Sequence, residues 1–521
     1  MKKLTLTSIL SLFAAFAASA ALAATTVDKT VMGGAGDYST RVPIPKDNKN
    51  YNIILESPDA TSEGAMFKGN GATVASLDGA TNTPGTTSGA GKYPAWNFTG
   101  EMTIDINSAE AGNITALKTG ANKFAWNLGT LTIKNSQSNS STYANVDLGA
   151  QFRMTANTPS KETSKLIVET NANMSGKNLA FAASNKGGLF IENNATVNYK
   201  VTNSAFASGT LLSIGQNATF DASESEYLFT FYSGSTLKIA TGGTFRAQKI
   251  ANQAGWNAEI NGNFEYVGKG QLNVANVSID GGKFVAQNFT TGTSARTVIS
   301  GNMIVANGGT IDQKGGIELK GTASSTASLT VEENAGYIKL YDNNEYNGRL
   351  FLTGYAQITI NKADAFTRVL SNGTSGNATL MLSAQNNTII VNEQAKFGKF
   401  NYWNGATELT IELSAENSDA KLYVGGISGA SGNTLVIENF DDNMICFWTG
   451  DEDKVFSYYD SIIANGVDGN TYGKSDLTLV KGTLDGKDVY FLNRINVPEP
   501  AEWAAIFGAI ALGFAVCRRR K

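Results

Sequence analysis

Three nine-residue stretches of the chain share one pattern. Residues 189–197 read LFIENNATV, residues 212–220 read LSIGQNATF and residues 237–245 read LKIATGGTF. Each stretch begins apolar-x-apolar, continues with three residues rich in Asn, Gly and Glu, and ends small-x-large apolar. Alternation with a period of two is typical of a half-buried β-strand, so each stretch predicts two short strands joined by a corner. Asn and Gly suit the corner because they tolerate the left-handed backbone conformation.

The same pattern recurs along the middle of the chain. Clear copies run from Leu166 to Met174, from Leu329 to Tyr337 and from Ile389 to Phe397. Degenerate copies run from Val146 to Phe152, Ala258 to Phe264, Val277 to Phe284 and Ile358 to Phe366. The closing large apolar residue falls at positions 152, 174, 197, 220, 245, 264, 284 and 303, in steps of 22, 23, 23, 25, 19, 20 and 19. A near-constant period of about 20 residues predicts a solenoid.

These repeats predict an all-β fold, namely a parallel β-helix in which each strand pairs with its copy in the next turn. We expect a right-handed coil from the crossover rule for parallel strands. No proline lies between Pro159 and Pro498, so nothing interrupts the hydrogen-bonded ladders. The pattern resembles the β-helical passengers of autotransporter-type surface proteins.

Composition narrows the chemistry that the chain can perform. Of 521 residues, 55 are glycine and only 17% are charged, which disfavours long amphipathic helices. The chain has no histidine, which excludes Ser-His-Asp and Cys-His catalysis and histidine metal ligands. It has two cysteines, Cys446 and Cys517, and Cys517 lies in a terminal apolar run. We therefore expect no disulfide framework and interpret Cys446 as a small buried hydrophobe.

The first 23 residues, MKKLTLTSILSLFAAFAASAALA, predict a signal peptide. Lys2 and Lys3 precede a short apolar stretch, and Ala21-Leu22-Ala23 fits the small-x-small rule for cleavage before Ala24. Ala21, Ala23 and Ala24 are thus the predicted cleavage residues, and the Sec export machinery is the expected partner.

The last 25 residues, VPEPAEWAAIFGAIALGFAVCRRRK, predict a membrane segment. The uncharged run from Trp503 to Cys517 would span roughly 22 Å as a helix, which is short for a ~30 Å hydrocarbon core. A cationic cluster follows it and places that end in the cytoplasm under the positive-inside rule. This membrane-stop cluster consists of Arg518, Arg519, Arg520 and Lys521. The body would then lie outside the inner membrane.

The terminal segment resembles the PEP-CTERM sorting signal of Gram-negative-type bacteria. Pro498-Glu499-Pro500-Ala501-Glu502-Trp503-Ala504 is similar to the Pro-Glu-Pro-x-x-Trp-Ala variant of that signal. The resemblance implies that an exosortase recognises and removes the tail, with Pro498, Glu499, Pro500 and Trp503 as the sorting motif. Two prolines fix an extended segment outside the membrane, which a protease can read. An ordinary membrane anchor would leave the Pro-Glu-Pro motif unexplained.

The sequence thus divides into five segments. They are the signal peptide (1–23), an N-terminal cap or first rungs (24–100), β-helix repeats (101–440), a C-terminal cap (441–496) and the sorting tail (497–521). Removing both ends takes six of the 41 basic and two of the 45 acidic residues, leaving 35 and 43 and a net charge of −8. That sign disfavours binding to nucleic acid.

Acidic clusters are the remaining candidate sites. They are Asp221, Glu224 and Glu226; Asp441 and Asp442; and Asp451, Glu452 and Asp453. None recurs at the spacing of the repeat, so we assign no catalytic residue, no metal ligand and no cofactor. Asp451-Glu452-Asp453 lacks the alternating ligands and glycine of a dedicated calcium loop, and the sequence leaves open whether it binds calcium.

Two hypotheses for function follow. The first is a non-enzymatic structural or adhesive β-solenoid, exported to the cell surface or extracellular matrix and processed by an exosortase. Its partners would be exopolysaccharide or neighbouring surface proteins. The second is a secreted β-helix lyase or hydrolase acting on acidic polysaccharide.

Overall fold

The computed structural model describes residues 26–32, 50–56, 65–66, 95–97, 101–118, 123–127, 130–137, 139–149, 151–155, 164–182, 187–224, 226–251, 253–287, 296–341, 349–370, 375–383, 386–403, 405 and 407–495. The predicted signal peptide, sorting tail and membrane helix lie outside these residues. The chain divides into two compact units, Met1–Gly268 and Lys269–Lys521. Of the described residues only Glu452–Phe456 (α1) form an α-helix, so the predicted all-β class is confirmed.

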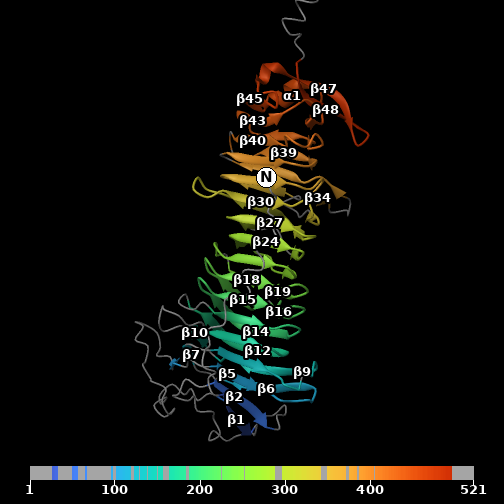
Figure 1. Ribbon diagram of the computed structural model, residues 1–521. Helices are drawn as coiled ribbons and strands as arrows, with labels where there is room; N and C mark the ends of the chain where they lie inside the picture. The colour runs from blue at the N-terminus through green and yellow to red at the C-terminus, as the bar shows by residue number, and fades with distance from the viewer. Residues whose placement is uncertain are drawn as a thin grey trace, which may run out of the picture. The chain divides into compact units, whose positions relative to one another are not determined.

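The first unit is a parallel β-solenoid with up to three strands in each turn. Its first ladder pairs β1 (Thr26–Met32), β2 (Asn50–Glu56), β5 (Glu101–Asp105), β8 (Thr130–Lys134), β11 (Lys165–Val168), β13 (Gly188–Ile191), β15 (Leu211–Ile214), β18 (Thr236–Ile239) and β21 (Asn257–Ile260). In Figure 1 these strands follow one another in chain order from β5 through β15 to β18.

Two further ladders complete the turns of this unit. The second pairs β3 (Ala65–Met66), β6 (Gly112–Lys118), β9 (Thr142–Asp147), β12 (Ala172–Phe181), β14 (Thr196–Phe206), β16 (Thr219–Ala222), β19 (Thr244–Ala247) and β22 (Asn263–Tyr266). The third pairs β4 (Ala95–Asn97), β7 (Lys123–Asn127), β10 (Gln151–Thr155), the C-terminal halves of β12 and β14, β17 (Leu228–Phe231) and β20 (Lys249–Ile250). The sequence motif covers only the first two strands of a turn.

The corner between the first two strands has the predicted left-handed conformation. Asn194, Asn217 and Gly242 occupy this corner in three successive turns, with φ of 64°, 54° and 73°. Asn is one of the few residues with a side chain that visit this region readily. At Gly242 a Cβ would also come within 2.2 Å of Asn217 Oδ1, so a larger residue there would displace the Asn217 side chain. The corner residues of the motif therefore follow from backbone geometry.

Large apolar side chains form stacks inside the first unit. In the second ladder the rings of Phe220 and Phe245 stack at 5.7 Å between centroids, and both side chains are fully buried. In the third ladder Phe206 and Phe231 stack at 5.1 Å. Parallel register places like residues beside one another, so a single buried position becomes a continuous aromatic column.

The second unit repeats the three-ladder arrangement. Its first ladder pairs β24 (Asn276–Asp280), β27 (Asn302–Ala306), β30 (Ala327–Val331), β33 (Ala356–Ile360), β37 (Asn387–Val391), β40 (Glu408–Leu413), β43 (Asn433–Phe440) and β45 (Tyr459–Gly466). The second consists of β25 (Lys283–Ala286), β28 (Thr310–Lys314), β31 (Ile338–Tyr341) and β34 (Phe366–Val369), followed by β38 (Ala395–Phe397), β41 (Leu422–Val424) and β44 (Ile445–Phe447). The third pairs β23 (Leu272–Val274), β26 (Arg296–Ile299), β29 (Gly316–Lys320), β32 (Arg349–Thr353), β36 (Thr379–Ser383), β39 (Lys399–Tyr402) and β42 (Ile427–Gly429). A two-residue strand, β35 (Ser375–Gly376), pairs antiparallel with β34.

The described strands after residue 470 pair antiparallel. β47 (Leu477–Leu484) and β48 (Lys487–Arg494) form a hairpin, and β48 runs antiparallel to β44. β46 (Thr471–Gly473) runs antiparallel to β45, and a short 3₁₀ helix, Lys474–Asp476, follows it. Cys446 lies in β44, packs against Val489 and Phe491 and is fully buried, as expected for a small hydrophobe. Burial raises the pKa of its thiol to about 12.

The structure corrects the repeat at its start. Phe152, predicted to close a turn, lies in β10 of the third ladder. The residue that pairs with Met174 in the second ladder is Val146. Parallel pairing also reaches β1 and β2, in a region where the sequence shows no clear pattern of repeats.

Two closing positions are also wrong in the second unit. Met303 lies in β27 of the first ladder, opposite Val277. Tyr337 is 38% exposed, and its neighbour Ile338 is the buried residue that pairs with Ile311. The turn from Ile311 to Ile338 is 27 residues long, so the period of the repeat is not constant. Loops between strands change in length while the strands keep their register. A fixed spacing in the sequence therefore does not predict where each strand begins.

We predict that Phe220→Ala destabilises the first unit by about 3–5 kcal/mol, because it opens a cavity in the aromatic stack. Phe190→Ala is the matched control, since Phe190 lies in β13 at an outward, partly exposed position. Urea unfolding followed by circular dichroism measures both. Equal effects of the two substitutions would contradict the inward placement of Phe220.

Candidate functional site

The predicted sorting and cleavage residues cannot be placed. Pro498, Glu499, Pro500 and Trp503, the cluster Arg518 to Lys521, and Ala21, Ala23 and Ala24 all lie outside the described residues. Within the described part of the chain, no helix has the length and apolar character needed to cross a membrane. Candidate sites in the structure are therefore the polar clusters of the body.

The first acidic cluster is separated by the fold. Asp221 lies on β16, beside Arg246 of β19, and Arg246 lies beside Glu265 of β22. The guanidinium of Arg246 is 2.7 Å from Glu265 and 3.8 Å from Asp221. Glu224 instead accepts a hydrogen bond from the hydroxyl of Tyr227 at 2.9 Å. Stacking thus places a cation between Asp221 and Glu265 and does not form a pair of catalytic carboxylates.

The Asp451-Glu452-Asp453 cluster fixes local structure. Asp451 is the N-cap of α1, and its carboxylate accepts a hydrogen bond from the backbone N–H of Lys454 at 3.2 Å. Glu452 Oε1 accepts from Thr478 Oγ1 at 2.5 Å and from the backbone N–H of Leu479 at 3.0 Å, which ties α1 to β47. Among the described residues no group of three or more Cys, Asp or Glu side chains could hold a metal ion.

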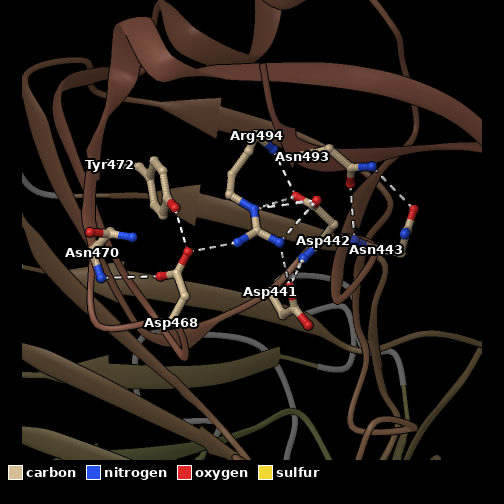
Figure 2. A network of polar contacts seen from close by, with 8 residues as sticks. All are labelled: Asp441, Asp442, Asn443, Asp468, Asn470, Tyr472, Asn493 and Arg494. Atoms are coloured by element: carbon tan, nitrogen blue, oxygen red, sulfur yellow. Dashed lines mark hydrogen bonds and ion pairs between the residues drawn. The ribbon is translucent and has the colours of Figure 1, made fainter. Parts of the chain in front are cut away.

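A network of polar contacts surrounds Arg494 at the end of β48 (Figure 2). Its Nη2 is 2.7 Å from Asp441 Oδ1 and 3.1 Å from Asp442 Oδ2, and its Nη1 is 3.0 Å from Asp468 Oδ2. The backbone N–H of Arg494 also donates to Asp442 Oδ1 at 2.8 Å. Figure 2 shows the guanidinium pointing between these three carboxylates. One cation thus joins the loop after β43, the loop after β45 and the last described strand.

Two neighbours complete this network. Tyr472 donates its hydroxyl hydrogen to Asp468 Oδ2 at 2.5 Å, and the guanidinium carbon of Arg494 is 5.7 Å from the centroid of the Tyr472 ring. Asn443 and Asn493 also join the loop after β43 to β48, since the backbone N–H of Asn443 donates to Asn493 Oδ1 at 2.9 Å. All three aspartates and the arginine are partly exposed.

The contacts in this network favour the charged forms of Asp468 and Arg494. The hydrogen bond from Tyr472 is the main cause that lowers the pKa of Asp468 to about 2, with smaller contributions that include the charge of Arg494. The hydrogen bond to Asp442 is the main cause that raises the pKa of Arg494. A carboxylate with so low a pKa cannot act as a general acid at neutral pH. The geometry instead suits a structural role, in which Arg494 holds two loops against β48. The sequence missed Arg494 and Asp468 because only Asp441 and Asp442 are adjacent in the chain.

Comparison with protein-family models finds no matching family, and comparison with curated proteins finds no significant relative. Function is therefore inferred from the residues of this chain.

We expect Arg494→Ala to lower the stability of the second unit by about 1–3 kcal/mol, because the substitution leaves three carboxylates without their shared cation. Lys454→Ala is the control. It removes the lysine of an ion pair with Asp451 in the same unit. Because the Lys454 side chain is 66% exposed, we expect no measurable change in stability. Urea unfolding followed by tyrosine and tryptophan fluorescence measures both. An unchanged midpoint for Arg494→Ala would show that the network does not stabilise this unit.

The lowered pKa of Asp468 predicts a pH-dependent loss of stability. In the unfolded chain this carboxyl has a pKa of about 3.9. A pKa lowered on folding contributes stability that is complete above about pH 4 and disappears as pH falls through the folded pKa of about 2. We expect Asp468→Asn to be less stable than the native protein at pH 7, with the difference vanishing near pH 2. Thermal melts between pH 7 and pH 2 measure this, and a constant difference would contradict it.

Proposed function

We propose that this protein is an exported, non-enzymatic structural β-solenoid of the cell surface or extracellular matrix, and that an exosortase removes its C-terminal tail. The order of residues in the tail carries the proposal. Pro498-Glu499-Pro500 comes first, then the apolar run, and then Arg518 to Lys521. Together with the signal peptide pattern before Ala24, this order favours export followed by a temporary stay in the membrane.

The body supports a structural role in two ways. Its stacked strands satisfy backbone hydrogen bonds between successive turns, which suits a stiff unit with a repetitive outer face. Its prominent carboxylates form intramolecular contacts, as Asp442 does with Arg494 and as Glu452 does with Leu479. These contacts favour stabilising roles for the acidic clusters that the sequence singles out.

Replacing Pro498, Glu499 and Pro500 with alanine tests the sorting proposal. In the native host we expect the altered protein to keep its tail and to accumulate in the inner membrane. The native protein should instead end before the apolar run. Mass spectrometry of the C-terminal peptide distinguishes the two products. Alanine substitution of Pro43, Pro45 and Glu56 is a matched control within the exported chain. Normal removal of the tail from the triple-alanine protein would overturn the proposal.

A further inference from the structure

One outer face of the second unit combines lysines with tyrosines. It is formed by β25, β28 and β31, which pair in parallel in that order. Alternation along these strands buries Phe284, Ile311 and Ile338 inside the solenoid. The positions between them and beside them face outward. We call these residues the basic-aromatic face: Lys283, Asp312, Lys314, Tyr337, Lys339 and Tyr341.

The charge of this face opposes that of the chain. The charged residues of β25, β28 and β31 are three lysines and one aspartate, which gives a net charge of +2. The whole chain has a net charge of −4. A local cluster of one sign on a chain of the other sign attracts an anionic ligand to that location.

Asp312 holds two residues of the basic-aromatic face in position. Its side chain is only 10% exposed, and its Oδ2 lies 3.0 Å from the Nζ of Lys283. The hydroxyl of Tyr341 donates to its Oδ1 at 3.5 Å. Hydrogen bonding to Asp312 raises the pKa of Lys283, so this lysine is charged at neutral pH. Asp312 neutralises one lysine, so among the charged residues of these three strands Lys314 and Lys339 carry the remaining positive charge.

Tyr337 gives the face an exposed aromatic ring. It is 38% exposed, and the Nζ of Lys339 lies 4.1 Å from the centroid of its ring. An aromatic ring offers an apolar surface to the C–H groups of a sugar ring, and a neighbouring ammonium can pair with a carboxylate on that sugar. The lysine and the tyrosine are close enough to contact one sugar unit together.

We propose that the basic-aromatic face binds an anionic polysaccharide, with Tyr337 stacking against a sugar ring and Lys339 and Lys314 pairing with its carboxylates. This inference rests on the proposed function, since it requires the body to lie outside the cell. The lysines lie on three adjacent parallel strands and Tyr337 directly precedes the last of them, so the groups follow one another across the sheet, which suits an extended chain. The same groups also suit single-stranded nucleic acid, but the negative charge of the body disfavours binding to it, and export would separate the protein from nucleic acid in the cytoplasm.

The first unit offers an internal comparison. The equivalent strands β16, β19 and β22 place Asp221, Arg246 and Glu265 outward. Their net charge is −1, and Arg246 is paired on both sides. We therefore assign the binding to the second unit alone.

The test uses the full-length chain purified in mild detergent and affinity electrophoresis through gels that contain polygalacturonate. We expect polygalacturonate to retard the protein, neutral dextran not to retard it, and added salt to weaken the retardation. Tyr337→Ala combined with Lys339→Ala should weaken binding at least about tenfold, since it removes the ring and a main charge. Lys314→Glu should also weaken it, by reversing a charge on the same face.

Tyr232→Ala combined with Lys238→Ala is the matched control. Tyr232 is 46% exposed and the Lys238 side chain is 55% exposed, and both lie in the first unit. This pair removes the same two residue types from positions outside the basic-aromatic face and should leave binding unchanged. Circular dichroism checks that every variant is folded.

Three results would overturn the inference. They are equal retardation by dextran, equal loss of binding in the control variant, and tighter binding to single-stranded DNA than to polygalacturonate. Shortening of the polygalacturonate during the assay would instead contradict the non-enzymatic part of the proposed function and leave the binding result standing. Export and tail processing are measured in cells, so their failure is recognised separately.

Discussion

Parallel pairing between successive turns is the constraint on which the rest of the structure depends. Each strand donates and accepts its backbone hydrogen bonds with the strand one turn before and one turn after it. Every side chain therefore lies beside the residue at the same position in the next turn. Inside the first unit this produces the stack of Phe220 and Phe245, and at the corner it repeats the left-handed residues Asn194 and Asn217. A side chain is therefore compatible with its position only when it also packs against the residues at the same position in the neighbouring turns.

The same constraint governs the polar outer faces. Asn145, Asn173 and Asn198 form a ladder, in which the amide of Asn173 donates to Asn145 Oδ1 at 3.0 Å and accepts from Asn198 at 2.9 Å. An amide can stack on its own copy because it both donates and accepts. Two ionised carboxylates cannot pair in this way because both only accept. Glu169 and Glu192 lie one turn apart, and burial together with the charge of Glu192 raises the pKa of Glu169. Ladders of Asn, or of alternating charges, therefore suit a solenoid better than rows of one charge.

Parallel pairing gives way to antiparallel pairing after residue 470, and the side-chain contacts change with it. The hairpin of β47 and β48 pairs with β44, so the edge of that parallel ladder meets a strand of the opposite direction. Repetition no longer specifies the contacts here, and single residues such as Arg494 and Glu452 join segments that are far apart in the sequence. The basic-aromatic face lies where repetition still holds, and it is distinguished by charge. The proposed roles of the two regions, stabilising and binding, follow from this difference.

The sequence by itself determined the all-β class, the solenoid repeat, the corner residues and the burial of Cys446, because each depends on local alternation or on the backbone freedom of Asn and Gly. The proposed sorting signal likewise rests on the order of residues in the sequence. The sequence did not locate the third strand of each turn or the longer turns of the second unit, because loops of variable length hide the period. The tertiary structure alone decided that Asp441, Asp442 and Asp468 share Arg494, and that Lys283, Asp312 and Tyr341 meet on one face. The residues of each group are far apart in the sequence. The antiparallel hairpin brings Arg494 to its three aspartates, and the register between turns brings Lys283, Asp312 and Tyr341 together.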